Sequence, residues 1–154
     1  MAITITTLED NPLANTYVQS LVHIVFSTKD RRPIIANKSQ LWAYMAGICK
    51  NEKIFIHEIG GMPDHAHLLI QQPPTMALSD IVNKIKTGSS QWMGTKFAWQ
   101  RGFGAFSVSA SNIDTVVGYI RTQEKHHKKM SFDEEFLALL KKHGIPFDLK
   151  YVFG

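Results

Sequence analysis

Apolar residues recur along this chain at two spacings, and each spacing predicts one type of element. Residues 20–28 are rich in Val, Ile and Phe and end before a charged segment, so we expect a strand there. Along a strand side chains alternate between faces, which puts Val22, Ile24 and Phe26 on one face and His23 on the other. Apolar residues three and four apart predict amphipathic helices elsewhere.

The other elements are expected by the same reasoning. Residues 1–16 have no clear pattern and are expected to be irregular. Ser131 and Glu134 form a capping-box pattern that predicts the start of the last helix, which Gly144 and Pro146 end. The remaining expectations are a helix at 37–50, strands at 54–59 and 65–70 joined by a turn at 60–64, a helix from Leu78 that weakens near Gly88 and Gly94, a strand within 102–108, and a helix starting near Ser111 or Asn112 and running past Ile120.

This order of elements predicts an α+β fold. The first six elements match a ferredoxin-like split βαβ antiparallel sheet with helices on one face, which puts the first and third strands side by side. An added C-terminal helix carries Tyr119. We expect one domain over residues 1–154, with a core at about 18–130 and a C-terminal helix and tail at 131–154.

Length and composition exclude several classes of protein. A chain of 154 residues is typical of one domain, and its single cysteine, Cys49, cannot form an intrachain disulfide or a cysteine zinc site. Residues 1–15 lack the pattern of a secretory signal, and no apolar run approaches the ~20 residues that span a bilayer. We therefore expect a cytoplasmic protein that does not enter a membrane.

The positive charge is concentrated in one part of the chain. The net charge is only +4, but residues 84–129 carry eight basic and two acidic side chains. A basic stretch on a globular domain is a candidate phosphate-contacting face, and an ordinary solvated helix surface explains the charge about equally well.

The most informative polar pattern lies in the third expected strand, within the sequence Asp64-His65-Ala66-His67. His65 and His67 share one face of that strand, opposite apolar positions that can face a core. Two imidazoles at this spacing can bind one cation, although hydrogen-bonded polar residues are the commoner explanation. His23 is expected on the same face of the neighbouring strand.

A second pattern lies in the helix that carries Tyr119. Gln123 follows four residues later, so both side chains lie on one stripe, to one side of the apolar positions. Tyr119 is thus a boundary residue whose hydroxyl can reach a cleft, and an ordinary amphipathic tyrosine is the alternative. The adjacent His126 and His127 stand among lysines, which is typical of a solvated helix end.

Together these motifs resemble the single-tyrosine HUH transposases of bacterial insertion sequences and their REP-associated relatives. The likeness rests on Met62-Pro63-Asp64-His65-Ala66-His67-Leu68-Leu69, Gly104-Ala105-Phe106-Ser107-Val108 and Tyr119-Ile120-x-x-Gln123, and covers roughly residues 18–130.

The resemblance implies a metal-dependent DNA strand transferase. His65, His67 and Gln123 would hold Mg²⁺ or Mn²⁺, with His23 and Asp64 next to these ligands. Tyr119 would attack the scissile phosphodiester of single-stranded DNA at a hairpin-flanked end, giving a 5′-phosphotyrosine link and a free 3′-hydroxyl. Such relatives suggest a homodimer with composite sites, in which one chain's tyrosine serves the other chain's histidines.

Contacts to the DNA backbone are expected from basic side chains, and contacts to its bases from aromatic ones. The aromatic candidates are Phe97, Trp99 and Phe103, for which a core or dimer role is equally open. The basic candidates are Lys84, Lys86, Lys96, Arg101 and Arg121, with Arg31 and Arg32 after the first strand.

Two other functions fit part of the pattern. A DNA-binding regulator of the same fold could have lost cutting, but His65, His67, Tyr119 and Gln123 are all present. A small metal hydrolase would leave Tyr119 and the basic stretch unused.

Overall fold

A four-stranded antiparallel sheet in the order β2-β3-β1-β4 forms the centre of the molecule. The computed structural model describes residues 15–154. The elements are β1 (Leu21–Ser27), η1 (Lys29–Arg31), α1 (Lys38–Asn51), β2 (Phe55–Met62), β3 (His65–Gln71), α2 (Leu78–Met93), β4 (Gly104–Val108), η2 (Ala110–Asn112), α3 (Ile113–Arg121), α4 (Gln123–His126) and α5 (Phe132–Lys142).

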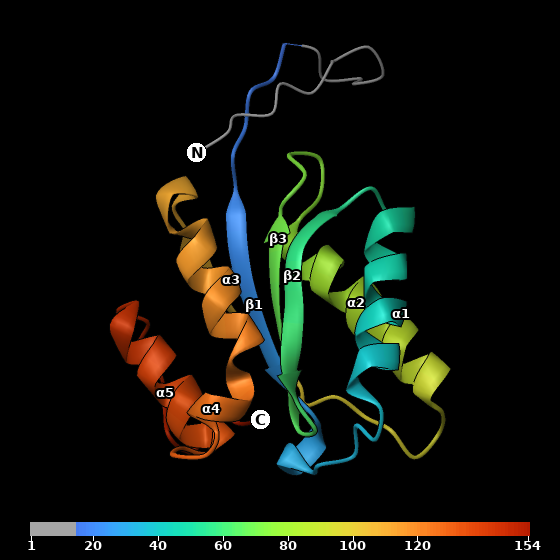
Figure 1. Cartoon of the computed structure of the whole chain (residues 1–154), viewed down its shortest axis with the longest axis vertical. Helices are drawn as coiled ribbons and strands as arrows, with labels where there is room; N and C mark the ends of the chain where they lie inside the picture. The colour runs from blue at the N-terminus through green and yellow to red at the C-terminus, as the bar shows by residue number, and fades with distance from the viewer. Residues whose placement is uncertain (1–14) are drawn as a thin grey trace.

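Each face of the sheet is covered by its own group of helices (Figure 1). Helices α1 and α2 pack on one face, where Val22, Ile24 and Phe26 of β1 join the larger apolar core. Helices α3, α4 and α5 lie across the other face, and the side chains of α5 form a smaller core with Val25 and Phe106. The split βαβ unit thus has its helices on one face, as expected, and the added C-terminal helices cover the opposite one.

The pairing of the strands confirms the expected topology and sets the positions of the histidines. Strand β1 pairs with β3, the first strand with the third, and Val25 is opposite His67 while Ser27 is opposite His65. His23, two residues before Val25, lies on the same face of β1 as Val25 and Ser27. The face that carries the three imidazoles is the one covered by α3, α4 and α5.

Three local expectations differ from the structure. The expected turn at residues 60–64 is wrong for residues 60–62, which continue strand β2, and the turn consists of Pro63 and Asp64. Helix α2 does not weaken at Gly88 and ends at Gly94, where φ is 106°. The tyrosine helix is interrupted at Thr122, so Gln123 begins the short helix α4. Of the irregular segment expected at residues 1–16, residues 1–14 lie outside the described part of the chain.

Two glycines let the added helices approach the sheet closely. A Cβ on Gly60 would lie 2.7 Å from the carbonyl oxygen of Ile120, so α3 can reach β2 only where this side chain is missing. A Cβ on Gly104 would lie 2.7 Å from the Phe136 ring, which packs α5 against β4. Contacts this short are repulsive for a real Cβ, so any larger residue would push these helices outward.

No helix within residues 15–154 combines the length and the apolar composition needed to cross a membrane. Cys49 is fully buried in α1, and burial raises the pKa of its thiol to about 12.

Candidate active site

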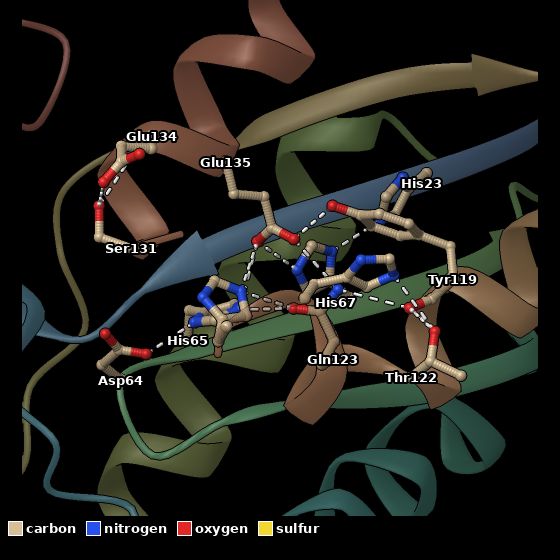
Figure 2. A network of polar contacts seen from close by, with 12 residues as sticks. His23, Asp64, His65, His67, Tyr119, Thr122, Gln123, Ser131, Glu134 and Glu135 are labelled. Carbon is tan, nitrogen blue, oxygen red and sulfur yellow. Dashed lines mark hydrogen bonds and ion pairs between the residues drawn. The ribbon is translucent and has the colours of Figure 1, made fainter. Parts of the chain in front are cut away.

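The two histidines of β3 present the same ring atom to one centre. His65 and His67 are completely buried, and the Nε2 atoms of both rings face the carboxylate of Glu135 from α5 (Figure 2). The opposite nitrogens have partners of their own: His65 Nδ1 lies 2.7 Å from Asp64 Oδ1, and His67 Nδ1 lies 2.9 Å from His23 Nε2. Asp64 and His23 therefore hold the two rings in place through these contacts.

Helices α3 and α4 bring Tyr119 and Gln123 to the same centre. Gln123 is almost fully buried, and its Oε1 atom lies 2.9 Å from His65 Nε2. The Tyr119 ring stands edge-on to His67, with the ring centroids 5.8 Å apart, and the phenol hydroxyl donates a hydrogen bond to Glu135 Oε2. The structure thus brings together the four residues that the sequence analysis singled out for chemistry, all within one chain.

Glu135 lies at the middle of this cluster and was not among the sequence-based candidates. Its side chain is 1% exposed, and Oε1 lies 3.0 Å from His67 Nε2, while Oε2 also accepts a hydrogen bond of 3.1 Å from Gln123 Nε2. One signal could have found it. Phe132, Phe136 and Leu140 form the apolar stripe of α5, and an acidic residue three positions after Phe132 falls on that buried stripe.

His127 is a second residue that the sequence reasoning misplaced. A solvated helix end was expected for the pair at positions 126 and 127, but His127 is 7% exposed, and its Nε2 atom lies 3.1 Å from Glu135 Oε1. The expectation is wrong for His127 because α4 turns it toward α5. His126 is half-buried, and its ring lies 4.6 Å from that of Tyr119.

Burial and hydrogen bonding shift the pKa values of His65, His67 and Glu135 in different directions. Burial alone would lower the pKa of His65, but its hydrogen bonds to Asp64, Glu135 and Gln123 raise it to about 9. Burial lowers the pKa of His67. Burial favours a neutral Glu135, but hydrogen bonds from His65, His67 and Tyr119 outweigh it and hold the pKa of this carboxyl well below its usual range. The charged pair is therefore His65 and Glu135.

The phenol stays protonated in this arrangement. Burial, and then the hydrogen bond to Glu135, raise the pKa of Tyr119 above its ordinary value. Tyr119 is therefore a neutral hydrogen-bond donor to the Glu135 carboxylate.

The donor atoms fit a divalent cation. The ligand atoms of His65, His67 and Glu135 all lie within 4.8 Å of one another. The hydrogen bond between His23 and His67 can reverse its direction when His67 Nε2 gives up its proton, so the supporting contacts also fit metal binding.

Five of the seven expected DNA-contacting cations already have polar partners within the chain. Lys86 donates to the carbonyl oxygens of Gln100 and Gly102, and burial lowers its pKa. Lys96 and Arg101 are exposed. The remaining candidates form ion pairs: Lys84 with Glu52 at 3.3 Å, Arg121 with Glu58 at 2.5 Å, Arg31 with Asp133 at 3.0 Å and Arg32 with Asp30 at 3.7 Å.

The expected base-stacking aromatics fall into two groups. Phe97 is buried in the larger core, and Trp99 packs edge-on against Phe26 with ring centroids 4.7 Å apart. Trp99 also donates a hydrogen bond to Ser89. Both therefore have the core role that the sequence left open, whereas Phe103 is 39% exposed.

Sequence comparison identifies relatives over most of the chain. A family model described as "Transposase IS200 like" matches residues 16–123. The transposase for insertion sequence element IS200 of Salmonella typhimurium is 26% identical over 133 residues, covering 78% of this chain and 87% of the relative. The corresponding Salmonella typhi transposase matches equally well.

Two solved structures share the fold. A REP-associated tyrosine transposase bound to a REP hairpin has a TM-score of 0.60 and 19% identity, over 73% of this chain and 71% of that one. A Deinococcus radiodurans R1 protein assigned as a transposase has a TM-score of 0.55 and 21% identity, over 70% of this chain and 93% of that one.

Proposed function

The chain belongs to the IS200-like transposase family, and from this premise we propose that it cuts and rejoins single-stranded DNA through a covalent link to Tyr119. The observation that carries the proposal is the convergence of Tyr119, the two histidines of β3 and Gln123 on one centre. A nucleophile and a set of metal ligands are what this reaction requires.

The proposed reaction begins with the phenol. Glu135 Oε2 orients the phenol hydroxyl, and the Tyr119 oxygen forms a bond to the phosphorus of the scissile phosphodiester as its proton leaves to solvent. The bond from phosphorus to the 3′ oxygen breaks, and this oxygen takes up a proton. The products are a 5′-phosphotyrosine and a free 3′-hydroxyl. The hydrogen bond from Tyr119 to Glu135 supports this orientation of the phenol. Because the covalent link conserves the phosphodiester bond energy, the reverse reaction rejoins DNA without ATP.

His65, His67 and an oxygen of Gln123 or Glu135 would hold the metal. Mg²⁺ and Mn²⁺ accept oxygen and imidazole ligands, and such an ion polarises the phosphate and offsets the charge that develops on it. The two oxygens of Glu135 suit separate roles, because Oε1 faces the histidines and Oε2 faces the phenol.

The proposed substrate is a DNA strand with a hairpin next to the cut. The structural relative bound to a REP hairpin supports this choice. Composite sites in a homodimer rest on the resemblance alone, and a cytoplasmic location rests on the sequence alone. In the single chain Tyr119 already lies beside its own His67, so this contact needs no second copy.

The test is formation of a covalent adduct. The protein is incubated with labelled single-stranded hairpin oligonucleotides, with Mn²⁺ or with EDTA, and resolved on a denaturing gel. We expect an adduct with Mn²⁺ that is lost with EDTA and in Tyr119→Phe. Tyr44→Phe is the matched control, since Tyr44 is a partly exposed tyrosine that stacks on Trp92.

Binding without any adduct in the wild type, under every metal condition, would instead support a regulator that no longer cuts. An adduct that persists in Tyr119→Phe would rule out Tyr119 as the nucleophile.

A further inference from the structure

A cavity of about 390 Å³ lies beside the active site and has no role in the chemistry proposed above. It is bounded by the end of β1, the segment before β4, helix α5 and residues 147–154. Aromatic side chains line much of its wall: Phe103, Phe132, Phe136, Phe147, Tyr151 and Phe153. We call it the aromatic cavity.

One side chain joins the aromatic cavity to the active site. The Phe132 ring lines the cavity, and its centroid lies 4.7 Å from that of His65, with the planes 31° apart. Ser27 also lines the cavity and is the direct partner of His65 across β1 and β3. The Phe132 ring is therefore the side chain that lies between a group bound in the cavity and the candidate metal ligand His65.

The rim of the aromatic cavity provides charge and hydrogen-bonding groups. Arg101 and Gln100 line it, and the Arg31 guanidinium stacks over the Phe153 ring at 4.9 Å. Lys86 binds the backbone of Gln100 and Gly102, which both line the cavity. Arg31 is also paired with Asp133 at 3.0 Å, so the exposed Arg101 is the lining residue that can contact a phosphate beside a ring stacked in the cavity.

We propose that the aromatic cavity binds one unpaired nucleobase of the DNA strand, next to the nucleotide whose phosphate faces His65 and His67. The proposal rests on the proposed DNA substrate. It follows from three observations: aromatic walls that can stack on a base, the polar side chains of Gln100 and Arg101 in the lining, and the ring of Phe132 shared with the active site. Holding a neighbouring base would fix the strand so that its phosphate lies within reach of Tyr119.

The experiment compares two probes of equal charge. Fluorescence anisotropy measures the affinity for a dT12 oligonucleotide and for a twelve-unit abasic strand with the same phosphates. Stacking of one base is worth about 5- to 150-fold in affinity. We expect the wild type to prefer dT12 by at least about fivefold, and Phe103→Ala to remove most of this preference. Phe103 is 39% exposed, so the variant is expected to fold.

A second variant and a control complete the design. Tyr151→Ala removes another exposed wall residue and should also reduce the preference for dT12, whereas Phe55→Ala, an exposed aromatic on β2, should leave it unchanged. If the two cavity variants prefer dT12 as strongly as the wild type does, the proposal is overturned.

Failure of this proposal is distinguishable from failure of the proposed function. A Tyr119 adduct with unchanged probe preference in the cavity variants would overturn only the nucleobase site. Loss of preference without any adduct would retain the nucleobase site in a protein that binds DNA but does not cut it.

Discussion

Oε1 of Glu135 lies 3.0 Å from Nε2 of His67, and 68 positions of the sequence separate the two residues. The last helix therefore completes a site whose other groups come from β3, α3 and α4. A buried carboxylate costs free energy of folding unless it is fully paired, and the Glu135 carboxylate contacts three imidazoles and a phenol. Here both carboxylate oxygens have hydrogen-bonding partners. A substitution of Glu135 therefore changes the surroundings of the histidines, of Tyr119 and of Gln123 together.

Replacing Glu135 by Gln should weaken metal binding. An amide is a poorer ligand for a hard divalent ion than a carboxylate, and loss of even an outer partner of a metal ligand costs about 10–100-fold. We therefore expect the Mn²⁺ affinity of Glu135→Gln, measured by calorimetry, to fall by at least about tenfold. Glu134→Gln is the control, because Glu134 is exposed and contacts Ser131 rather than the site. Equal Mn²⁺ affinity in both variants would exclude Glu135 as a ligand.

Replacing Asp64 by Asn should also weaken metal binding, through His65. Asp64 accepts a hydrogen bond from Nδ1 of His65, which fixes the ring and makes Nε2 a stronger ligand. We expect a loss of about tenfold in Mn²⁺ affinity with little change in thermal stability in EDTA. Asp30→Asn, at an exposed aspartate after β1, should change neither quantity. If Asp64→Asn binds Mn²⁺ like the wild type, Asp64 has no part in orienting the ligand.

Sequence patterns predicted the sheet, and they also selected four of the side chains that the structure brings together at the candidate site. Alternation along β3 determines that His65 and His67 share a face, and helical spacing determines that Tyr119 and Gln123 share a stripe. Both patterns are properties of single elements. His127 could not be found this way, because the angle between α4 and α5 decides which polar residues of α4 face inward. For Glu135, helical spacing puts the residue on the buried stripe of α5, but it does not show that this stripe faces the histidines of β3.

The close contact between α3 and β2 is a second feature that spacing does not reveal. Gly60 was expected in a turn, but it lies in β2 under the backbone of Ile120, the residue after Tyr119. The role of Gly60 in the structure is to leave space for the helix that carries the nucleophile.

Replacing Gly60 by Ala should therefore affect both stability and chemistry. The new methyl group would lie 2.7 Å from the Ile120 carbonyl oxygen, so α3 must move outward. Overpacking of this kind costs about 1–3 kcal/mol in the free energy of unfolding, which urea denaturation measures. We also expect a lower yield of the Tyr119 adduct, because the phenol moves relative to His67.

Gly47 offers the matched control for Gly60. A Cβ there meets nothing within 4 Å, and the residue is inside α1. Gly47→Ala should leave the adduct yield unchanged and increase stability by about 0.5–1 kcal/mol. A Gly60→Ala protein as stable and as active as the wild type would show that α3 tolerates displacement from β2.

Mixing two inactive variants tests whether Tyr119 acts on its own chain. His67→Ala lacks a metal ligand and Tyr119→Phe lacks the nucleophile, so neither should form an adduct alone. If sites were composite, a mixed dimer would contain one intact site and the mixture would regain activity. Because Tyr119 contacts Glu135 and lies edge-on to His67 within one chain, we expect no recovery on the denaturing gel. Each variant mixed with wild type shows whether an inactive chain inhibits an active one. Recovery in the doubly inactive mixture would establish the composite arrangement and show that α3 exchanges between chains.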